Sequence, residues 1–316
     1  MKPRMIRYSR LGFLLILSCL VLTEFRFAQV PPTKTDLKVT EPEDDIRVDT
    51  SLVDVSVSVF GKDRKLVTTL VQDDFVIFEN GVEQRIEYFA NVEQPFTVVL
   101  LMDLSGSMQN NLEQIKSASL KFIDQLRPTD RIEAIVFNEG MHVLNTNLLD
   151  RETLRKEIKR LEVYRSGTFL YPVVEVVSQR VLKRLTGRKA LVLFTDGIDG
   201  TPLPANGIRK STYETSLREA VSSSALVYCI KFGSDVAIYD KIANAYLNDL
   251  AEQTGGKVFR DNLSTSFQNV AEELRRQYSI GYYPQTIAKK NEVRKIEVRI
   301  KKPGLIVRSR NVYIGR

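Results

Sequence analysis

Two hydroxyl residues follow a carboxylate at the end of an apolar stretch in the middle of the chain. Asp103, Ser105 and Ser107 come directly after residues 96–102, which are apolar but for Thr97. Such a short run predicts a buried strand of a parallel sheet, and open α/β sheets bind ligands at the carboxyl ends of their strands. One carboxylate with neutral hydroxyl oxygens suits a hard cation, Mg²⁺ or Mn²⁺ and less firmly Ca²⁺. The spacing therefore predicts a metal site at one edge of a sheet.

Alone, the Asp-x-Ser-x-Ser string has an ordinary explanation, because Ser and Gly are common in turns and Asp often caps helices. Two further segments favour the metal site. Thr168 follows Gly167 on a loop ahead of a helical pattern, and Asp196 follows a second buried-strand run at residues 189–195. The three loops together offer two carboxylates and three hydroxyls.

In this order, Asp103, Ser105, Ser107, Thr168 and Asp196 resemble the metal-ion-dependent adhesion site of the von Willebrand factor A domain. The resemblance implies that the three hydroxyl residues bind the metal directly and that the two aspartates bind it directly or through water. Hydroxyl ligands carry no charge, so the cation would keep spare charge and an open position. The resemblance implies that an acidic residue of a partner protein fills that position.

The elements around these loops predict a doubly wound, Rossmann-like α/β domain at residues 96–277. Strand patterns alternate with helical ones, and residues 141–149 predict an antiparallel strand at one edge. The other predicted strands are residues 131–138, 225–232 and 257–259, and the predicted helices are residues 111–127, a helix capped by Asp150, and residues 170–185.

Two capping boxes are predicted to open the later helices of this domain. They pair Ser211 with Glu214 and Thr265 with Gln268. The helix between them is predicted to turn Ile242, Tyr246 and Leu250 inward, and the last helix Phe267, Val270, Ala271 and Leu274.

The chain before and after this domain has the pattern of β-strands. Four valines alternate with polar residues at positions 53–59, and residues 75–79 lead into the hairpin signal Asn80-Gly81. Further strands are predicted at residues 86–89, 278–283, 293–300 and 304–314. Each flank is short for a stable sheet of its own, so residues 48–95 and 278–316 are predicted to form one β-sandwich that carries the α/β domain as an insertion.

The whole layout also resembles a bacterial family of von Willebrand factor A-related domains that is frequent in acidobacteria. The segments that carry this resemblance are Asp74-Phe75, Asn80-Gly81, Thr254-Gly255-Gly256 and residues 277–283. The resemblance implies an architecture and names no substrate.

Residues 1–28 are predicted to be an export signal, because basic residues precede an apolar run at residues 11–22 that is short for a membrane span. Cleavage near Ala28 or retention as a signal anchor is favoured over lipidation at Cys19. Residues 29–47 predict a linker. We therefore expect a periplasmic, extracellular or membrane-anchored bacterial protein, with any membrane association through this N-terminal segment.

The formal net charge of +7 is unevenly distributed. Residues 285–316 hold ten Lys or Arg and two Glu, and their alternation with apolar residues predicts a solvated sheet face. Contact with an anionic membrane surface or polyanion is the less favoured alternative, and no nucleic-acid partner is expected. Cys229, the only cysteine beyond the signal, is predicted to be a core residue, so no internal disulfide is expected.

No catalytic residues are expected. The single histidine, His142, falls on the predicted edge strand and gives the two serines no plausible base. Asp199 is the nearby candidate to activate a metal-bound water, and its ordinary role is that of a loop residue or of a partner to a metal ligand. We expect a metal-dependent protein-binding module of the adhesion type. The alternatives are an assembly scaffold with a structural metal and, less favoured, a metal-assisted hydrolase.

Overall fold

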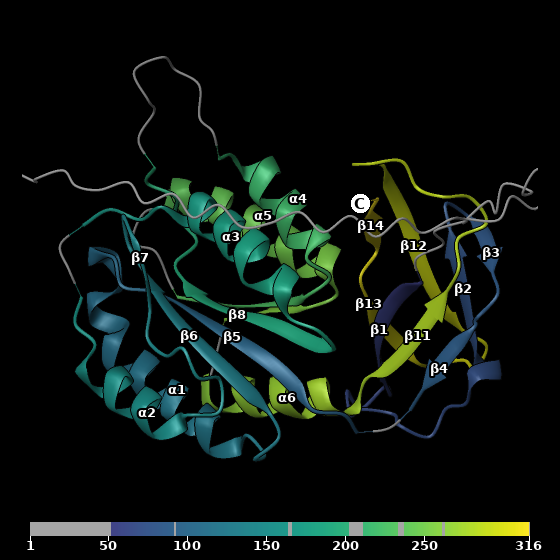
Figure 1. The fold of residues 1–316 in the computed structure, drawn as a ribbon, viewed down its shortest axis with the longest axis horizontal. Helices are drawn as coiled ribbons and strands as arrows, with labels where there is room; N and C mark the ends of the chain where they lie inside the picture. The colour runs from purple at the N-terminus through teal and green to yellow at the C-terminus, as the bar shows by residue number, and fades with distance from the viewer. Residues whose placement is uncertain are drawn as a thin grey trace, which may run out of the picture. The chain divides into compact units, whose positions relative to one another are not determined.

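The computed structural model describes residues 52–91, 93–163, 166–201, 211–232, 237–260 and 263–315. The predicted export signal at residues 1–28 and the linker at residues 29–47 lie outside the described residues. Within the described ranges, no helix is both long enough and apolar enough to cross a lipid bilayer. Figure 1 shows that these ranges form an α/β part and a β-sandwich.

A six-stranded sheet in the order β10-β9-β8-β5-β6-β7 forms the centre of the α/β part. Its strands are β5 (Phe96–Asp103), β6 (Arg131–Phe137), β7 (Met141–Val143), β8 (Arg188–Thr195), β9 (Leu226–Lys231) and β10 (Lys257–Phe259). All neighbours run parallel except β7, which pairs antiparallel with β6 at the edge. The predicted doubly wound fold with one antiparallel edge strand is confirmed.

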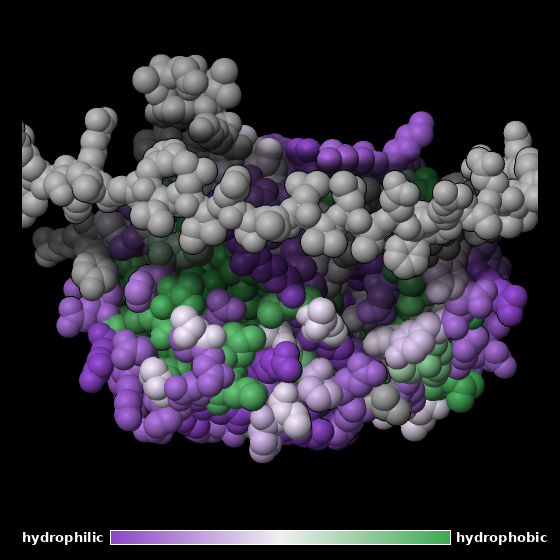
Figure 2. All heavy atoms as spheres, in the orientation of Figure 1, coloured by the Kyte–Doolittle hydropathy of each residue, from purple (hydrophilic) through white to green (hydrophobic). Residues whose placement is uncertain are grey.

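Helices cover both faces of this sheet because its central strands are apolar on both faces. On β5, Val98 and Leu100 belong to one core, and Val99 and Leu101 to the other. The first core is covered by α1 (Leu112–Gln125), α2 (Arg151–Arg160) and α6 (Leu263–Arg276), and the second by α3 (Leu170–Arg180), α4 (Tyr213–Ser222) and α5 (Ala237–Thr254). Figure 2 shows hydrophobic residues between the two helix layers, where the sheet lies.

Strands from both ends of the described chain form the sandwich, in two sheets ordered β13-β1-β11-β4 and β14-β12-β2-β3. The strands before the α/β part are β1 (Val53–Phe60), β2 (Phe75–Glu79), β3 (Val82–Gln84) and β4 (Tyr88–Ala90). Those after it are β11 (Tyr278–Tyr282), β12 (Val293–Ile300), β13 (Ile306–Ser309) and β14 (Val312–Ile314). Each sheet takes strands from both ends, so the predicted insertion of the α/β domain into a sandwich is confirmed.

Two strand predictions for the sandwich were wrong. The chain returns beside β2 at β3 and not at residues 86–89, because the two-residue turn at Asn80-Gly81 sets Val82 opposite Glu79. The later residues cross to the other sheet as β4, beside β11. The single strand predicted at residues 304–314 is β13 and β14, which lie in different sheets because residues 310–311 carry the chain across.

The edge strand predicted at residues 141–149 is also shorter than predicted and ends at Val143. Beyond it, main-chain bonds to β6 continue only from Leu144 and Leu148, and between them the side chain of Asn145 bonds to the main chain of β6. Its Oδ1 accepts the amide of Ala134 at 2.9 Å, and its Nδ2 donates to the carbonyl of Ile132 at 2.9 Å.

Three helix predictions needed correction. Thr212 caps α4 together with Thr215, in place of the predicted Ser211 and Glu214. Thr265 lies within α6 and not at its start. The helix predicted at residues 170–185 ends at Arg180, before a 3₁₀ turn at Leu182–Arg184.

The first residue predicted to face inward on α5 was wrong by one position. Ile242 is 56% exposed, and Ala243 is buried in its place. Tyr246 and Leu250 are buried as predicted, together with Leu247, so the buried face has the ordinary spacing of an amphipathic helix. The predicted inward residues of α6 are all buried, Cys229 is buried, and Asp150 caps α2 by accepting the amide of Thr153.

A buried ion pair joins the two ends of the chain inside the sandwich. Arg294 of β12 donates from Nη1 to Glu79 of β2 at 2.6 Å, and from Nε to Glu292 at 2.9 Å. Tyr282 of β11 donates its hydroxyl to the other oxygen of Glu79 at 2.8 Å. The side chains of Arg294 and Glu79 are 5% and 6% exposed, so part of the basic C-terminal charge is neutralised in the interior.

The turn between α5 and β10 depends on two glycines. Gly255 has a φ of +84°, and a Cβ on Gly256 would overlap the carbonyl oxygen of Val227 on the neighbouring strand. We expect Gly256→Ala to lower the free energy of unfolding by about 4 kcal/mol, because the clash is with backbone in a buried sheet. Gly140→Ala is the matched control, since its nearest contact is 3.9 Å away, and urea unfolding of both variants measures the difference.

Candidate metal centre

Asp103 lies at the carboxyl end of β5, the strand between β8 and β6 in the middle of the sheet. Its side chain is fully buried. The Oδ1 atom accepts the amide of Ser105 at 2.9 Å, and the Oδ2 atom accepts the hydroxyl of Thr195 at 2.8 Å. The carboxylate is therefore held by its own loop and by the neighbouring strand β8 before it contacts any ligand.

Ser105 and Ser107 follow on the first loop, which becomes a 3₁₀ turn at Gly106–Asn111. Their hydroxyl oxygens lie 3.2 Å apart, with Ser105 buried and Ser107 exposed. The amide of Gly106 donates to the carbonyl of Ser166 at 3.3 Å, which ties this loop to the one that carries Thr168.

Thr168 lies buried on the second loop, directly before α3. The loop is fixed from two sides. The carboxylate of Glu139 accepts the amide of Gly167 at 2.8 Å, and the carbonyl of Thr168 accepts the amide of Gly200 at 2.7 Å. The second contact ties this loop to the third, so the three loops are neighbours.

Asp196 begins the third loop, at the carboxyl end of β8, and is buried. Its Oδ1 atom accepts the amide of Ile198 at 3.0 Å. Gly197, with a φ of +83°, lets the loop pass close to α5, because a Cβ there would lie 2.9 Å from both Ala243 and Leu247. The five residues predicted from the sequence are thus brought together on three connected loops at one edge of the sheet.

Thr195 is a site residue that the sequence interpretation missed. Besides donating to Asp103, its hydroxyl oxygen accepts the amide of Gly197 at 2.9 Å, so it links the first loop to the third. Threonine is common in strands, and nothing in the linear sequence separates this one from the others. Thr195 is recognised as a site residue only from the parallel register of β5 and β8. That register sets Met102 opposite Phe194, so the next residues, Asp103 and Thr195, are neighbours.

Burial of Asp103 raises its pKa to about 6, and the neighbouring charge of Asp196 adds to this effect. The hydrogen bonds from Ser105 and Thr195 act in the opposite direction. A cation beside these two carboxylates would favour their charged forms.

The two residues considered for catalysis have other surroundings. The carboxylate of Asp199 accepts the amide of Tyr171 in the first turn of α3 at 3.2 Å and the hydroxyl of Thr201 at 2.7 Å. His142 lies exposed on β7. Asp199 therefore caps a helix beside the site, in agreement with its ordinary interpretation.

The chemistry of the donor set fits a hard divalent cation. Two buried carboxylates and three hydroxyls provide oxygen donors alone, without the imidazole or thiolate that would favour zinc or copper. Within the described ranges, no group of three or more His, Cys, Asp or Glu side chains is placed to hold a metal. The predicted centre has two acidic side chains, which is fewer than such a group. A cation at these loops would therefore also need the hydroxyl groups as ligands.

A model of the von Willebrand factor type A domain matches residues 97–273, which span all five of these residues. The chain belongs to the von Willebrand factor type A domain family. Domains of this family are generally protein-interaction modules, and many of them depend on a metal.

Individual relatives are distant. Human inter-alpha-trypsin inhibitor heavy chain H4 is 27% identical over 221 residues, which are 62% of this chain and 22% of the relative. An uncharacterized protein of Synechocystis sp. is 32% identical over 107 residues, 33% of this chain and 25% of the relative. The chain thus spans about a quarter or less of the length of these relatives. Mussel byssus proximal thread matrix protein 1, solved with zinc in its MIDAS motif, has a TM-score of 0.49 at 13% identity, covering 63% of this chain and 50% of that one.

Proposed function

We propose that this von Willebrand factor type A domain is an exported, metal-dependent protein-binding module of the adhesion type. Ser105, Ser107 and Thr168 bind a divalent cation directly, and Asp103 and Asp196 bind it directly or through water. Mg²⁺ is the proposed ion; Mn²⁺ can take its place, and Ca²⁺ can do so less firmly. An exposed Asp or Glu of a partner protein is the remaining ligand.

The observation that carries this proposal is the joining of the three loops. The amide of Gly106 donates to the carbonyl of Ser166, and the amide of Gly200 donates to the carbonyl of Thr168. These bonds place the loop that carries the Thr168 hydroxyl between two loops that each bear a buried carboxylate. Because the loops are fixed by their own backbone and by Thr195, the donors are arranged before a metal arrives. Ser107 is exposed, so the site is open to a partner on that side.

Binding is favoured over catalysis by the surroundings of the site. The nearby carboxylate of Asp199 is engaged with the first turn of α3, and His142 is exposed on a strand at the edge of the sheet. Catalysis by a metal-bound water would need a free base beside the cation. We therefore propose a binding role, and a hydrolase or a purely structural metal becomes an outcome of the test.

The test is capture of partner proteins from envelope extract by the immobilised chain. In Mg²⁺ we expect capture that falls to background when EDTA is added or when Asp103 is replaced by Ala. Replacing the acidic residue of the captured partner by its amide should cost as much as chelation, since both changes remove the same bond. A partner that binds at full strength in excess EDTA would favour the scaffold alternative.

A further inference from the structure

Thr168 differs from the other proposed metal ligands in the way it is held. Its hydroxyl forms no hydrogen bond within the described ranges, whereas the side chains of Asp103 and Ser105 are both hydrogen-bonded. A threonine side chain is stiff about χ1, so the direction of its hydroxyl follows the main chain. The position of this ligand is therefore set by the contacts that hold the loop at residues 166–169.

The turn between β6 and β7 holds this loop on both sides of Thr168. Ahead of Thr168, the amide of Gly167 donates to Oε1 of Glu139 at 2.8 Å. After it, the amide of Phe169 donates to the carbonyl of Asn138 at 2.8 Å. Two adjacent residues of one turn thus fix the two neighbours of the ligand.

This turn is a firm support, because it is closed on itself and joined to the first loop. The amide of Asn138 donates to the carbonyl of Gly140 at 3.0 Å, and the amide of Gly140 donates to Oδ1 of Asn138 at 2.9 Å. Directly before the turn, the carbonyl of Phe137 accepts the amide of Leu104 in the first loop at 2.8 Å. Residues 137–140 therefore set the first and second loops relative to each other.

Gly167 gives the Glu139 carboxylate its place against the loop. A Cβ on Gly167 would lie 3.1 Å from Oε1 of Glu139 and 3.8 Å from its Cδ. The φ of Gly167 is not in the left-handed region, so the backbone does not require glycine here. The missing side chain instead lets the carboxylate approach the amide that it binds.

Glu139 supplies the bond in this support that a substitution can remove. The bonds of the loop to Gly106, Gly200 and Asn138 join main chain to main chain, and so they persist in side-chain variants. Glu139 is exposed, and its replacement should leave the fold intact.

We propose that Glu139 is a positioning residue of the metal centre, which sets the direction of the Thr168 hydroxyl by holding the amide of Gly167. A carboxylate that accepts an N–H forms a stronger bond than a neutral acceptor does. The inference rests on the proposed function, since Thr168 is one of the proposed metal ligands. Glu139 itself does not bind the cation.

Amide hydrogen exchange of the full chain in EDTA tests the contact without a metal. Glu139→Ala should make the amide of Gly167 exchange about tenfold faster, because a charge-assisted bond is lost. Glu139→Gln keeps a side-chain oxygen as acceptor, so its exchange should stay within about threefold of the parent rate.

Mg²⁺ affinity, measured by titration calorimetry, tests whether the contact acts through Thr168. Glu139→Ala should lower the affinity about tenfold, and Glu139→Gln should restore most of it. In a Thr168→Ala background, Glu139→Ala should lower the affinity by less than about twofold, because the ligand that it positions is already absent.

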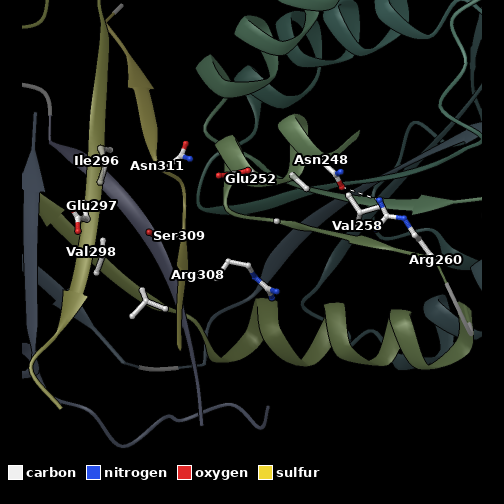
Figure 3. Close-up of a pocket in the computed structure, with 13 residues that line it drawn as sticks. Asn248, Glu252, Val258, Arg260, Ile296, Glu297, Val298, Arg308, Ser309 and Asn311 are labelled. Atoms are coloured by element: carbon white, nitrogen blue, oxygen red, sulfur yellow. Dashed lines mark hydrogen bonds between the residues drawn. The ribbon is translucent and has the colours of Figure 1, made fainter. Parts of the chain in front are cut away.

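Two other exposed carboxylates are the matched controls. Glu113 is 84% exposed in the first turn of α1 and pairs with Lys116 of the same helix. Glu252 lines a cavity of about 610 Å³ bordered by α5, β10, β12 and β13, and none of the residues lining it belongs to the three loops (Figure 3). Glu113→Ala and Glu252→Ala should each change the Mg²⁺ affinity and the exchange of Gly167 by less than about twofold.

Three results would overturn the proposal. They are unchanged exchange of Gly167 in Glu139→Ala, an equal loss of affinity in Glu139→Gln and Glu139→Ala, and additive effects of Glu139→Ala and Thr168→Ala. Failure of the proposed function has a different signature, because Asp103→Ala would then bind Mg²⁺ as the parent does. The exchange rates in EDTA would still decide whether Glu139 holds the loop.

Discussion

Replacing Asp103 by alanine is expected to lower divalent-metal affinity by about a hundredfold or more while the fold persists. Asp103 is one of the two carboxylates of the centre, and it also holds the amide of Ser105 and the hydroxyl of Thr195. Its loss therefore removes a charge and loosens two loops. Titration calorimetry with Mg²⁺ and Mn²⁺ measures the affinity, and far-UV circular dichroism reports the fold.

Asp103→Asn separates the charge of this residue from its hydrogen bonds. The amide keeps the shape of the side chain, so we expect affinity to fall nearly as far as in Asp103→Ala. In EDTA, the free energy of unfolding of the Asn variant should equal or exceed that of the parent. The reason is that two neighbouring carboxylates are costly to bury without a cation. Unchanged metal affinity in both variants would refute the assigned centre.

Replacing Arg294 by methionine is expected to lower the free energy of unfolding by about 3–5 kcal/mol. Methionine follows the course of the arginine stem, but Glu79 then keeps a buried charge without its cationic partner, beside the hydroxyl of Tyr282. Urea unfolding followed by tyrosine fluorescence measures the loss, since the sequence contains no tryptophan.

The double variant Arg294→Met with Glu79→Gln isolates the unpaired charge. We expect it to recover a large part of the lost free energy, because an uncharged amide is cheaper to bury than a lone carboxylate. The surface pair Arg299 and Glu297 is the matched control, with side chains 59% and 43% exposed, and Arg299→Met should change the free energy by about 1 kcal/mol or less. Equal effects at Arg294 and Arg299 would contradict the assigned importance of burial.

The residues of the candidate centre could be predicted because each lies close to a feature that sequence makes visible. Asp103 and Asp196 directly follow apolar runs, and a buried strand of a parallel sheet is recognisable from such a run. Thr195 could not be found in this way. Its hydroxyl belongs to the site because of the pairing between β5 and β8, and a pairing between strands about ninety residues apart is not written in either strand alone.

The strands of the sandwich show the same limit. The alternation at Val53, Val55, Val57 and Val59 identified β1 and its inward face correctly. Period-two patterns do not say which sheet a strand joins, and so the crossing of residues 310–311 between the sheets was missed. Ile242 was misplaced for a related reason, because Ala243 is a weak hydrophobic signal and only packing against Gly197 selects it.

The arrangement of the sandwich also determines the order in which the protein can fold. Glu79 and Arg294 are 215 residues apart. Strand β1 likewise pairs with β11 and β13, which follow the α/β part in the sequence. The strand pairings of the α/β part span at most about 92 residues, far fewer than those of the sandwich, so this part can form first and bring the two flanking segments near each other. Loop closure then costs the sandwich far less entropy than the length of the intervening chain would demand. A ribosome that releases this protein N-terminus first thus exposes β1 to β4 for most of synthesis, and these strands depend on rapid folding of the inserted domain to find their partners.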